Sequence, residues 1–121
     1  MPDLPTLDLN VIEDLRALTP DDNDAFLREI IGIFLDDGPS RIAELEQCVA
    51  ANDRPKAVRA AHSLKGSAAN LGTADLRAAA EKVEHAAKAA ADLATLRPAI
   101  EVLKAKFAAA RTELQKLLPP A

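Results

Sequence analysis

A histidine, a lysine and a glycine stand one helical turn apart in the middle of the chain. His62, Lys65 and Gly66 occupy positions i, i+3 and i+4, so a helix places all three on one face. The apolar positions of the same stretch share the opposite, buried face of that helix, and they are Ala57, Ala61, Leu64, Ala68 and Leu71. An exposed imidazole beside a cation and a residue without a side chain can present a nucleophile to a large anionic partner.

Phosphoryl transfer is the chemistry that suits such a face. A histidine can take a phosphoryl group from an aspartyl phosphate and give it to another aspartate. One ring nitrogen must then be exposed and neutral, while the other is held by a hydrogen bond that fixes the tautomer and the ring direction. Lys65 is placed to balance the charge of the phosphoryl oxygens, and Gly66 leaves room for the backbone of the partner.

The eleven residues 62–72, His-Ser-Leu-Lys-Gly-Ser-Ala-Ala-Asn-Leu-Gly, resemble the signature of histidine-containing phosphotransfer (HPt) domains, the relay modules of multistep two-component signalling. Val83 and Glu84 follow 21 and 22 residues after the histidine, and a looser match of helix pattern extends over residues 25–118. The resemblance implies that His62 is phosphorylated and that Lys65 and Gly66 are its partners on the helix face. It also implies that Glu84 accepts the proton of the ring nitrogen nearest the backbone.

Apolar residues recur every three or four positions along the chain, and no strand pattern is present. The pattern predicts helices over about residues 7–18, 26–37, 41–51 and 92–118. A histidine helix follows Asn52-Asp53 and ends at Leu71-Gly72, and another begins after Thr73, which we expect to cap it. Gly38-Pro39 either ends or kinks the second helix, and Pro98 lies either in the first turns of the last helix or at a kink.

Short connections make successive helices antiparallel neighbours. The expected fold is therefore all-α, an antiparallel four-helix bundle with an additional short N-terminal helix, which is also the HPt-like fold. At 121 residues the chain is predicted to be a single domain over residues 1–121, with frayed tails at 1–6 and 119–121. We expect the apolar faces of the helices to be buried against one another within one bundle, so we expect a monomer.

The composition excludes several other classes of protein. Aromatic residues make up only 2% of the chain and the net charge is −4, so nucleic acid is not an expected partner. The N-terminus lacks the blocks of a signal peptide, and no apolar run reaches membrane-spanning length. The single cysteine, Cys48, excludes an internal disulfide and is expected in the core. We therefore expect a soluble, cytoplasmic protein.

Basic residues gather on the two helices of the expected site in a chain that is acidic overall: Arg54, Lys56, Arg59, Lys65, Arg77, Lys82 and Lys88. Receiver domains, the partners that the resemblance implies, present a carboxylate-lined pocket that a basic rim would steer. The docking residues we expect are Arg59, Ser63, Lys65, Gly66 and Arg77. Ordinary solvated surface charges remain the alternative interpretation of this rim.

Apolar residues of the amino-terminal half offer a second candidate surface. Ile12, Ile30 and Phe34 either add an apolar docking patch or all belong to the core. His85 adjoins Glu84 without a comparable motif, and we expect it to be an ordinary surface residue.

The resemblance implies a phosphorelay intermediate. It would accept a phosphoryl group on His62 from the receiver domain of a hybrid sensor histidine kinase and pass it to the receiver domain of a response regulator. No glycine-rich nucleotide motif is present, so kinase activity of its own is not expected. No cofactor or metal is expected either, since magnesium belongs to the partner receiver.

Two alternatives stay open. The chain could be the phosphoacceptor domain of a chemotaxis-type histidine kinase, phosphorylated from ATP by a separate catalytic domain. It could also be a non-catalytic helical adaptor that binds receiver domains and no longer uses its histidine. A metal-binding bundle of the ferritin type is disfavoured, because the sequence lacks the paired Glu-x-x-His motifs which that site requires.

Overall fold

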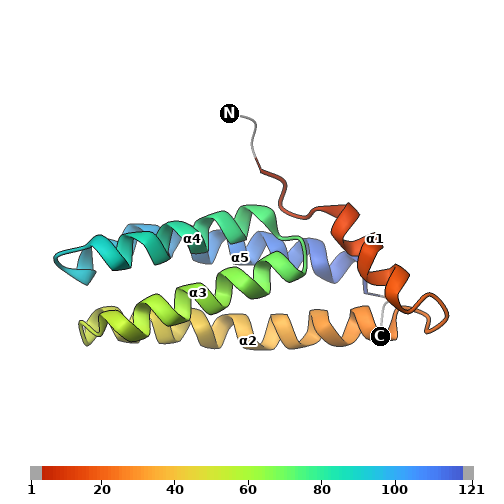
Figure 1. Cartoon of the computed structure of the whole chain (residues 1–121), viewed down its shortest axis with the longest axis horizontal. Coiled ribbons are helices and arrows are strands. Elements are labelled where there is room, and N and C mark those ends of the chain that lie inside the picture. Colours follow the sequence, from red (N-terminus) through yellow and green to blue (C-terminus); the bar gives the residue numbers. More distant parts are fainter. Residues whose placement is uncertain (1–3, 119–121) are drawn as a thin grey trace.

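A computed structural model describes residues 4–118, and within them the chain forms five α-helices and one 3-10 turn (Figure 1). The helices are α1 (Leu9–Leu18), α2 (Ala25–Ala50), α3 (Arg54–Asn70), α4 (Ala74–Ala89) and α5 (Arg97–Lys116). Helices α2 to α5 run along the long axis of the molecule, and α1 packs at one end of them. The predicted all-α bundle with an additional short N-terminal helix is confirmed.

Helix α2 is a single helix that continues through Gly38-Pro39, so of the two alternatives that the sequence left open, the end of a helix is excluded. Pro39 cannot donate a helical hydrogen bond, which normally weakens a helix at that position. Both halves of α2 nevertheless bury apolar side chains against α3 and α5, among them Phe34 and Ile42. Gly38 is itself buried under the Phe107 ring, where a Cβ atom would overlap the ring. Tertiary packing thus holds the helix together across the proline.

The hairpin of α3 and α4 positions the candidate site. Asp53 caps the start of α3 with its side chain, and Pro55 lies in the first turn as expected. Gly72 closes the turn between the helices with a φ of +72°, a conformation that glycine adopts without strain. Thr73 precedes α4, but its hydroxyl donates to the Ala68 carbonyl at 2.9 Å and makes no cap bond to α4. Thr73 is therefore the N-cap residue of α4 as predicted, but its buried hydroxyl satisfies the end of α3 instead of capping α4.

Alanines line the facing sides of α3 and α4 and allow these helices to pack closely. The five apolar positions predicted for the buried face of the histidine helix are all buried: Ala57, Ala61, Leu64, Ala68 and Leu71. On α4 the buried positions include Ala79, Ala80 and Ala87. Cys48 also lies in the core as expected. Small side chains on both helices bring the polar residues at the rim of this contact close together.

The last predicted helix divides into two parts. A 3-10 turn, η1 (Leu93–Leu96), precedes α5, and Pro98 lies in the first turn of α5 rather than at a kink. Asp92 caps the 3-10 turn by accepting a hydrogen bond from Ala94 N at 2.9 Å. Proline is tolerated here because the first turn of a helix has no intrahelical partner for its N–H groups.

The segment before α1 is attached to the hairpin. Asp75 N donates to the Pro5 carbonyl at 3.1 Å, and Asp8 N donates to the Gly72 carbonyl at 2.7 Å. The expected fraying of residues 1–6 therefore does not apply to Pro5, while residues 1–3 and 119–121 lie outside the described part. Across residues 4–118, no helix combines the length and apolar character that crossing a membrane would require.

Candidate functional site

His62 lies on the exposed face of α3 and points one ring nitrogen at α4. Its side chain is 67% exposed, and Nδ1 is 3.0 Å from Oε2 of Glu84. The two residues are 22 positions apart, and the turn at Gly72 brings them side by side. An ionised carboxylate can only accept a hydrogen bond, so Nδ1 carries the proton, and in the neutral form of the ring the lone pair is on Nε2. The structure therefore brings together the histidine and the glutamate that the sequence paired.

Glu84 is buried, with only 5% of its side chain exposed, and it is surrounded by cations. Lys65 Nζ forms an ion pair with Oε1 of Glu84 at 2.8 Å, although the geometry is not that of a regular hydrogen bond. Lys88 Nζ lies 3.4 Å from Oε2 of the same carboxylate. The Lys65 contact is the main cause that lowers the pKa of Glu84 to about 2, and His62 and Lys88 add to it against the opposing effect of burial. The carboxylate is thus ionised throughout the physiological pH range.

Lys65 contacts Glu84 in this structure, which differs from the expected place beside the phosphoryl group. Its side chain is only 21% exposed, because it lies along the helix face toward the buried carboxylate. A buried charge without a partner is strongly unfavourable, so the nearest cation pairs with it. Lys65 and His62 therefore contact the two oxygens of the same carboxylate.

Gly66 lies one turn beyond His62 and is exposed. A Cβ atom at this position would meet no other atom within 4 Å. Packing inside this chain therefore does not require a glycine here, and the free space lies outside the molecule. Ser63, beside the histidine, is exposed as well. This face of α3 consequently offers a second molecule an unobstructed approach to the imidazole.

The Hpt domain family matches the chain over residues 29–115, which includes all of α3 and α4. The chain belongs to the Hpt domain family. A similar protein is multistep phosphorelay regulator 1 of Schizosaccharomyces pombe, which is 29% identical over 79 residues, or 65% of this chain. The chain spans only 27% of the length of that relative, so the relative contains much more than an Hpt domain.

Two solved structures share this architecture. Histidine-containing phosphotransfer protein B (HptB) of Pseudomonas aeruginosa PAO1 superposes with a TM-score of 0.79 at 25% identity, covering 93% of this chain and 94% of that one. The HPT domain of a sensor hybrid histidine kinase from Shewanella gives a TM-score of 0.72 at 18% identity, covering 93% of both chains. The second likeness concerns the fold alone.

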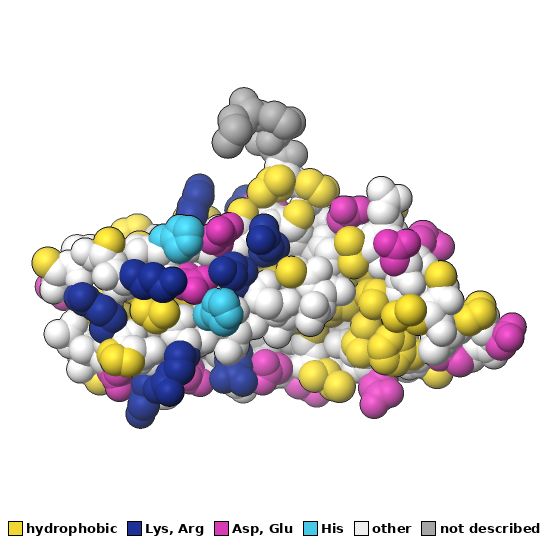
Figure 2. Space-filling model, in the orientation of Figure 1, with side chains coloured by type: hydrophobic (Ala, Val, Ile, Leu, Met, Phe, Trp, Pro, Cys, Tyr) yellow, Lys and Arg dark blue, Asp and Glu magenta, His cyan; other side chains and the backbone are white. Residues whose placement is uncertain are grey.

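Basic side chains surround the histidines of the Hpt domain on the surface of α3 and α4 (Figure 2). Some of them already have partners: Arg54 donates to the Ala90 carbonyl, and Lys56 pairs with Asp53. Arg59 and Arg77 are exposed and form no ion pair within residues 4–118. The predicted basic rim therefore exists, but only part of it is free to meet a partner.

His85 is an exposed residue on α4, as expected. Its side chain is 65% exposed, and Nε2 lies 4.0 Å from Oε1 of Glu81, at the limit of an ion pair. In the described part of the chain, no group of three or more His, Cys, Asp or Glu side chains is arranged to hold a metal ion.

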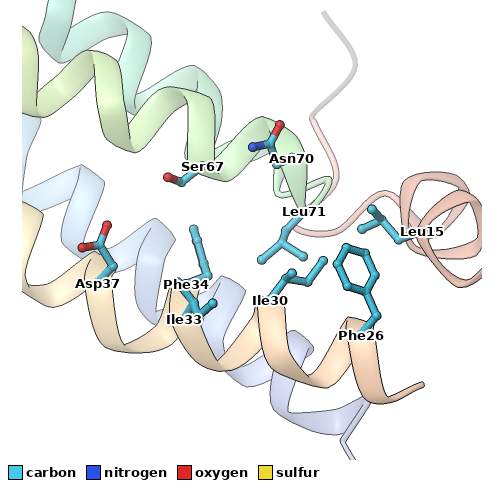
Figure 3. Close-up of a pocket in the computed structure, with 9 residues that line it drawn as sticks. All are labelled: Leu15, Phe26, Ile30, Ile33, Phe34, Asp37, Ser67, Asn70 and Leu71. Atoms are coloured by element: carbon cyan, nitrogen blue, oxygen red, sulfur yellow. The ribbon is translucent and has the colours of Figure 1, made fainter. Parts of the chain in front are cut away.

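An apolar groove of about 380 Å³ opens between α1, α2 and α3 (Figure 3). Its lining is mostly hydrophobic with a few polar side chains: Leu15, Phe26, Ile30, Ile33, Phe34, Asp37, Ser67, Asn70 and Leu71. Ile30 and Phe34 were among the residues that the sequence left undecided between a docking patch and the core. Both line the groove, but Phe34 is itself buried in the core and only Ile30 is partly exposed. Ile12 is fully buried and belongs to the core.

The sequence offered one further signal of this groove. Ile33 falls between buried residues of α2 yet is 60% exposed, because the apolar positions of α2 cover more than one face of the helix. Figure 2 shows the corresponding hydrophobic patch toward the α1 end of the molecule.

Proposed function

We propose that this Hpt domain is a phosphorelay intermediate that accepts a phosphoryl group on His62 from one receiver domain and passes it to another. The observation that carries the proposal is the exposed imidazole whose Nδ1 lies 3.0 Å from the buried carboxylate of Glu84. Membership in the Hpt domain family supports the same role. The donor is a hybrid sensor histidine kinase and the acceptor is a response regulator, each through its receiver domain.

The transfer needs no proton to leave the imidazole. Nε2 of His62 attacks the phosphorus of the aspartyl phosphate, a bond forms between nitrogen and phosphorus, and the receiver aspartate leaves as a carboxylate. The ring then carries a positive charge, which the ionised Glu84 stabilises through the hydrogen bond from Nδ1–H. Attack by the second aspartate reverses these steps and restores the neutral ring. Glu84 is thus a positioning residue that also stabilises charge.

Charge near the phosphoryl oxygens comes from both proteins. Magnesium belongs to the receiver in this proposal, and this chain supplies no cofactor and no kinase activity. The predicted docking residues Arg59, Ser63 and Arg77 lie exposed on α3 and α4, and Gly66 leaves space for the backbone of the receiver. Exposed arginines beside a carboxylate-lined pocket accelerate association more than they tighten the complex.

The apolar groove extends the same docking surface. Ser67, one turn beyond Ser63 on α3, lines the groove, so the groove is continuous with the histidine face. We assign it to the apolar face of a receiver helix. Ile33→Asp should raise the KM for a phosphorylated receiver and leave the maximal rate unchanged. Val102→Asp, at a site on α5 that is 51% exposed, is the matched control. Equal effects of the two changes would contradict this assignment.

Transfer of labelled phosphate from a phosphorylated receiver to the wild type and to His62→Gln tests the function. We expect acid-labile, alkali-stable label on the wild type and none on the variant. If several receivers leave the folded wild type unlabelled, two results decide between the alternatives. Label from a separate kinase domain with ATP would favour the chemotaxis-type phosphoacceptor. A His62→Gln variant that keeps its biological effect would favour the adaptor.

The remaining parts of the proposal concern the state of the protein. We propose that it acts in the cytoplasm as a monomer that binds neither nucleic acid nor membrane. Most of its apolar side chains are buried within one bundle, and we assign the exposed apolar groove to a receiver helix rather than to a second copy, which supports the monomer. Light scattering at increasing protein concentration should give a constant mass near 12.8 kDa, and a mass that doubles would contradict the monomer.

A further inference from the structure

One carboxylate oxygen of the Hpt domain is shared between the histidine and a second lysine. Oε2 of Glu84 lies 3.0 Å from His62 Nδ1 and 3.4 Å from Lys88 Nζ, while Lys65 takes the other oxygen at 2.8 Å. Lys88 follows Glu84 by one turn of α4, outside the residues that carry the family resemblance. The proposed function gives Lys88 no part.

A buried carboxylate next to an imidazole has two opposing effects on phosphoryl transfer. It orients the ring and stabilises the positive charge that forms during attack. The same negative charge also favours protonation of the resting ring, and a protonated imidazole has no lone pair with which to attack. Cations on the carboxylate weaken this second effect, because they offset its charge at the distance of the ring.

The ion pairs around the imidazole identify which groups can do this. His62 contacts Glu84 of α4, whose Oε2 also contacts Lys88, while Lys65 and the exposed Arg59 lie one turn from His62 on α3. Glu81 and His85, also on α4, contact each other on the exposed face. Within residues 4–118, no charged side chain of α1, α2 or α5 forms an ion pair with His62 or Glu84. Lys65 and Lys88 are therefore the cations that pair with the carboxylate held by His62, and Arg59 forms no ion pair with it.

We propose that Lys88 is a positioning residue that acts through Glu84 to keep the resting His62 neutral and nucleophilic. This proposal deepens the proposed function and rests on it for its kinetic consequence. An exposed Glu–Lys pair on a helix would contribute only a few tenths of a kcal/mol and would not influence a third residue. Here the carboxylate is buried and the oxygen paired with Lys88 also contacts the imidazole, so a change of charge at Lys88 reaches the ring.

The protonation of the imidazole can be measured without a partner. We would record the ring nitrogen chemical shifts of His62 by NMR between pH 5 and pH 9, in a His85→Gln background that leaves one imidazole. Lys88→Met should move the titration midpoint upward by about half a pH unit, and Lys88→Arg should restore it. Lys82→Met is the matched control, because Lys82 is exposed on α4 and forms no ion pair within the described residues.

Two NMR results would overturn the proposal. One is a midpoint for Lys88→Met within about 0.1 pH unit of the parent. The other is an equal shift for Lys82→Met, which would assign the effect to the overall surface charge rather than to the contact with Glu84.

Kinetics provide a second, separable arm. Lys88→Met should accept phosphate from a phosphorylated receiver about twofold more slowly at pH 6.5 and no more slowly than the wild type at pH 8.5. Equal slowing at both pH values would indicate a purely structural role and would overturn the proposal. If the wild type accepts no phosphoryl group, the proposed function fails, and the NMR titration still decides the role of Lys88.

Discussion

The two histidines of this Hpt domain lie on neighbouring helices and are almost equally exposed, at 67% for His62 and 65% for His85. They differ in the carboxylate that each one faces. His62 Nδ1 is 3.0 Å from Glu84, which is buried, while His85 Nε2 is 4.0 Å from Glu81, whose side chain is 39% exposed. Exposure makes an imidazole reachable, but a buried carboxylate at hydrogen-bond distance gives it a fixed direction and tautomer.

Their surroundings one turn further along differ too. Gly66 follows His62 at position i+4, whereas Ala89 follows His85 at the same spacing. Glu84 is held by two lysines from two helices, and Glu81 has only the exposed contact with His85 in the described part of the chain. The comparison indicates which two features distinguish a phosphoryl-accepting histidine from an ordinary surface histidine. They are a buried carboxylate that holds the ring and a residue without a side chain one turn away.

The carboxylates should give the largest difference between the two sites. Glu84→Ala should slow phosphoryl acceptance about 10- to 100-fold, because the ring loses both its fixed tautomer and its charge stabilisation. Glu81→Ala should change the rate less than about twofold, since exposed pairs contribute little. Single-turnover transfer from a phosphorylated receiver measures both. Similar losses in the two variants would contradict the comparison.

The glycine should give the next largest effect. Gly66→Leu should raise the KM for the receiver about tenfold, because a side chain would occupy the space that the partner needs. Ala89→Leu places the same side chain beside His85 and should leave KM unchanged. Urea unfolding is the control, and Gly66→Leu should be equally or more stable, as leucine is the better helix former. A loss of stability without a change in KM would refute the docking role of Gly66.

Stability should also distinguish the two carboxylates. The pKa of Glu84 is lowered from the ordinary 4.5 to about 2, so its ionised form stabilises the folded state fully above pH 4.5. That contribution is lost as the pH falls through about 2. The free energy of unfolding of the wild type should exceed that of Glu84→Gln by about 1–2 kcal/mol at pH 7, and the difference should shrink between pH 4.5 and pH 2. Glu81→Gln should show no such trend.

The smallest effect is expected at the second histidine itself. His85→Gln should accept phosphate within about twofold of the wild-type rate, because its only recorded ion pair in residues 4–118 is the 4.0 Å contact with Glu81. The same transfer assay measures it. Loss of acid-labile label in this variant would assign part of the chemistry to His85 and end the distinction between the two residues.

The choice of Glu84 as the partner of His62 came from the resemblance to HPt domains, but that residues 80–87 lie alongside His62 could be predicted from the helical period and the antiparallel turn. The partner of Lys65 could not, since the burial of Glu84 depends on how closely the alanines of α3 and α4 pack. The continuity of α2 through Pro39 was not predictable for a similar reason. Local propensity opposes a helix there, and contacts with residues distant in sequence, such as Phe107, overcome it.

The apolar groove was only partly foreseen. Ile30 and Phe34 look like core residues in a periodic pattern, and whether such residues are covered depends on where α1 packs. The position of α1 is set by backbone hydrogen bonds that join Asp8 and Pro5 to the hairpin of α3 and α4. The periodicity of apolar residues in the sequence does not predict such bonds.

Gly72 therefore determines how closely the segment before α1 lies to the hairpin, in addition to closing the turn between α3 and α4. A Cβ atom there would lie 2.8 Å from the Val11 side chain and 2.9 Å from the Asp8 carbonyl, so only glycine lets the segment before α1 lie this close. The same residue aligns His62 with Glu84 and places α1, with Leu15, at the end of the groove. A partner that binds both the groove and the histidine consequently depends on a spacing set at one backbone position, which directly follows the groove residue Leu71.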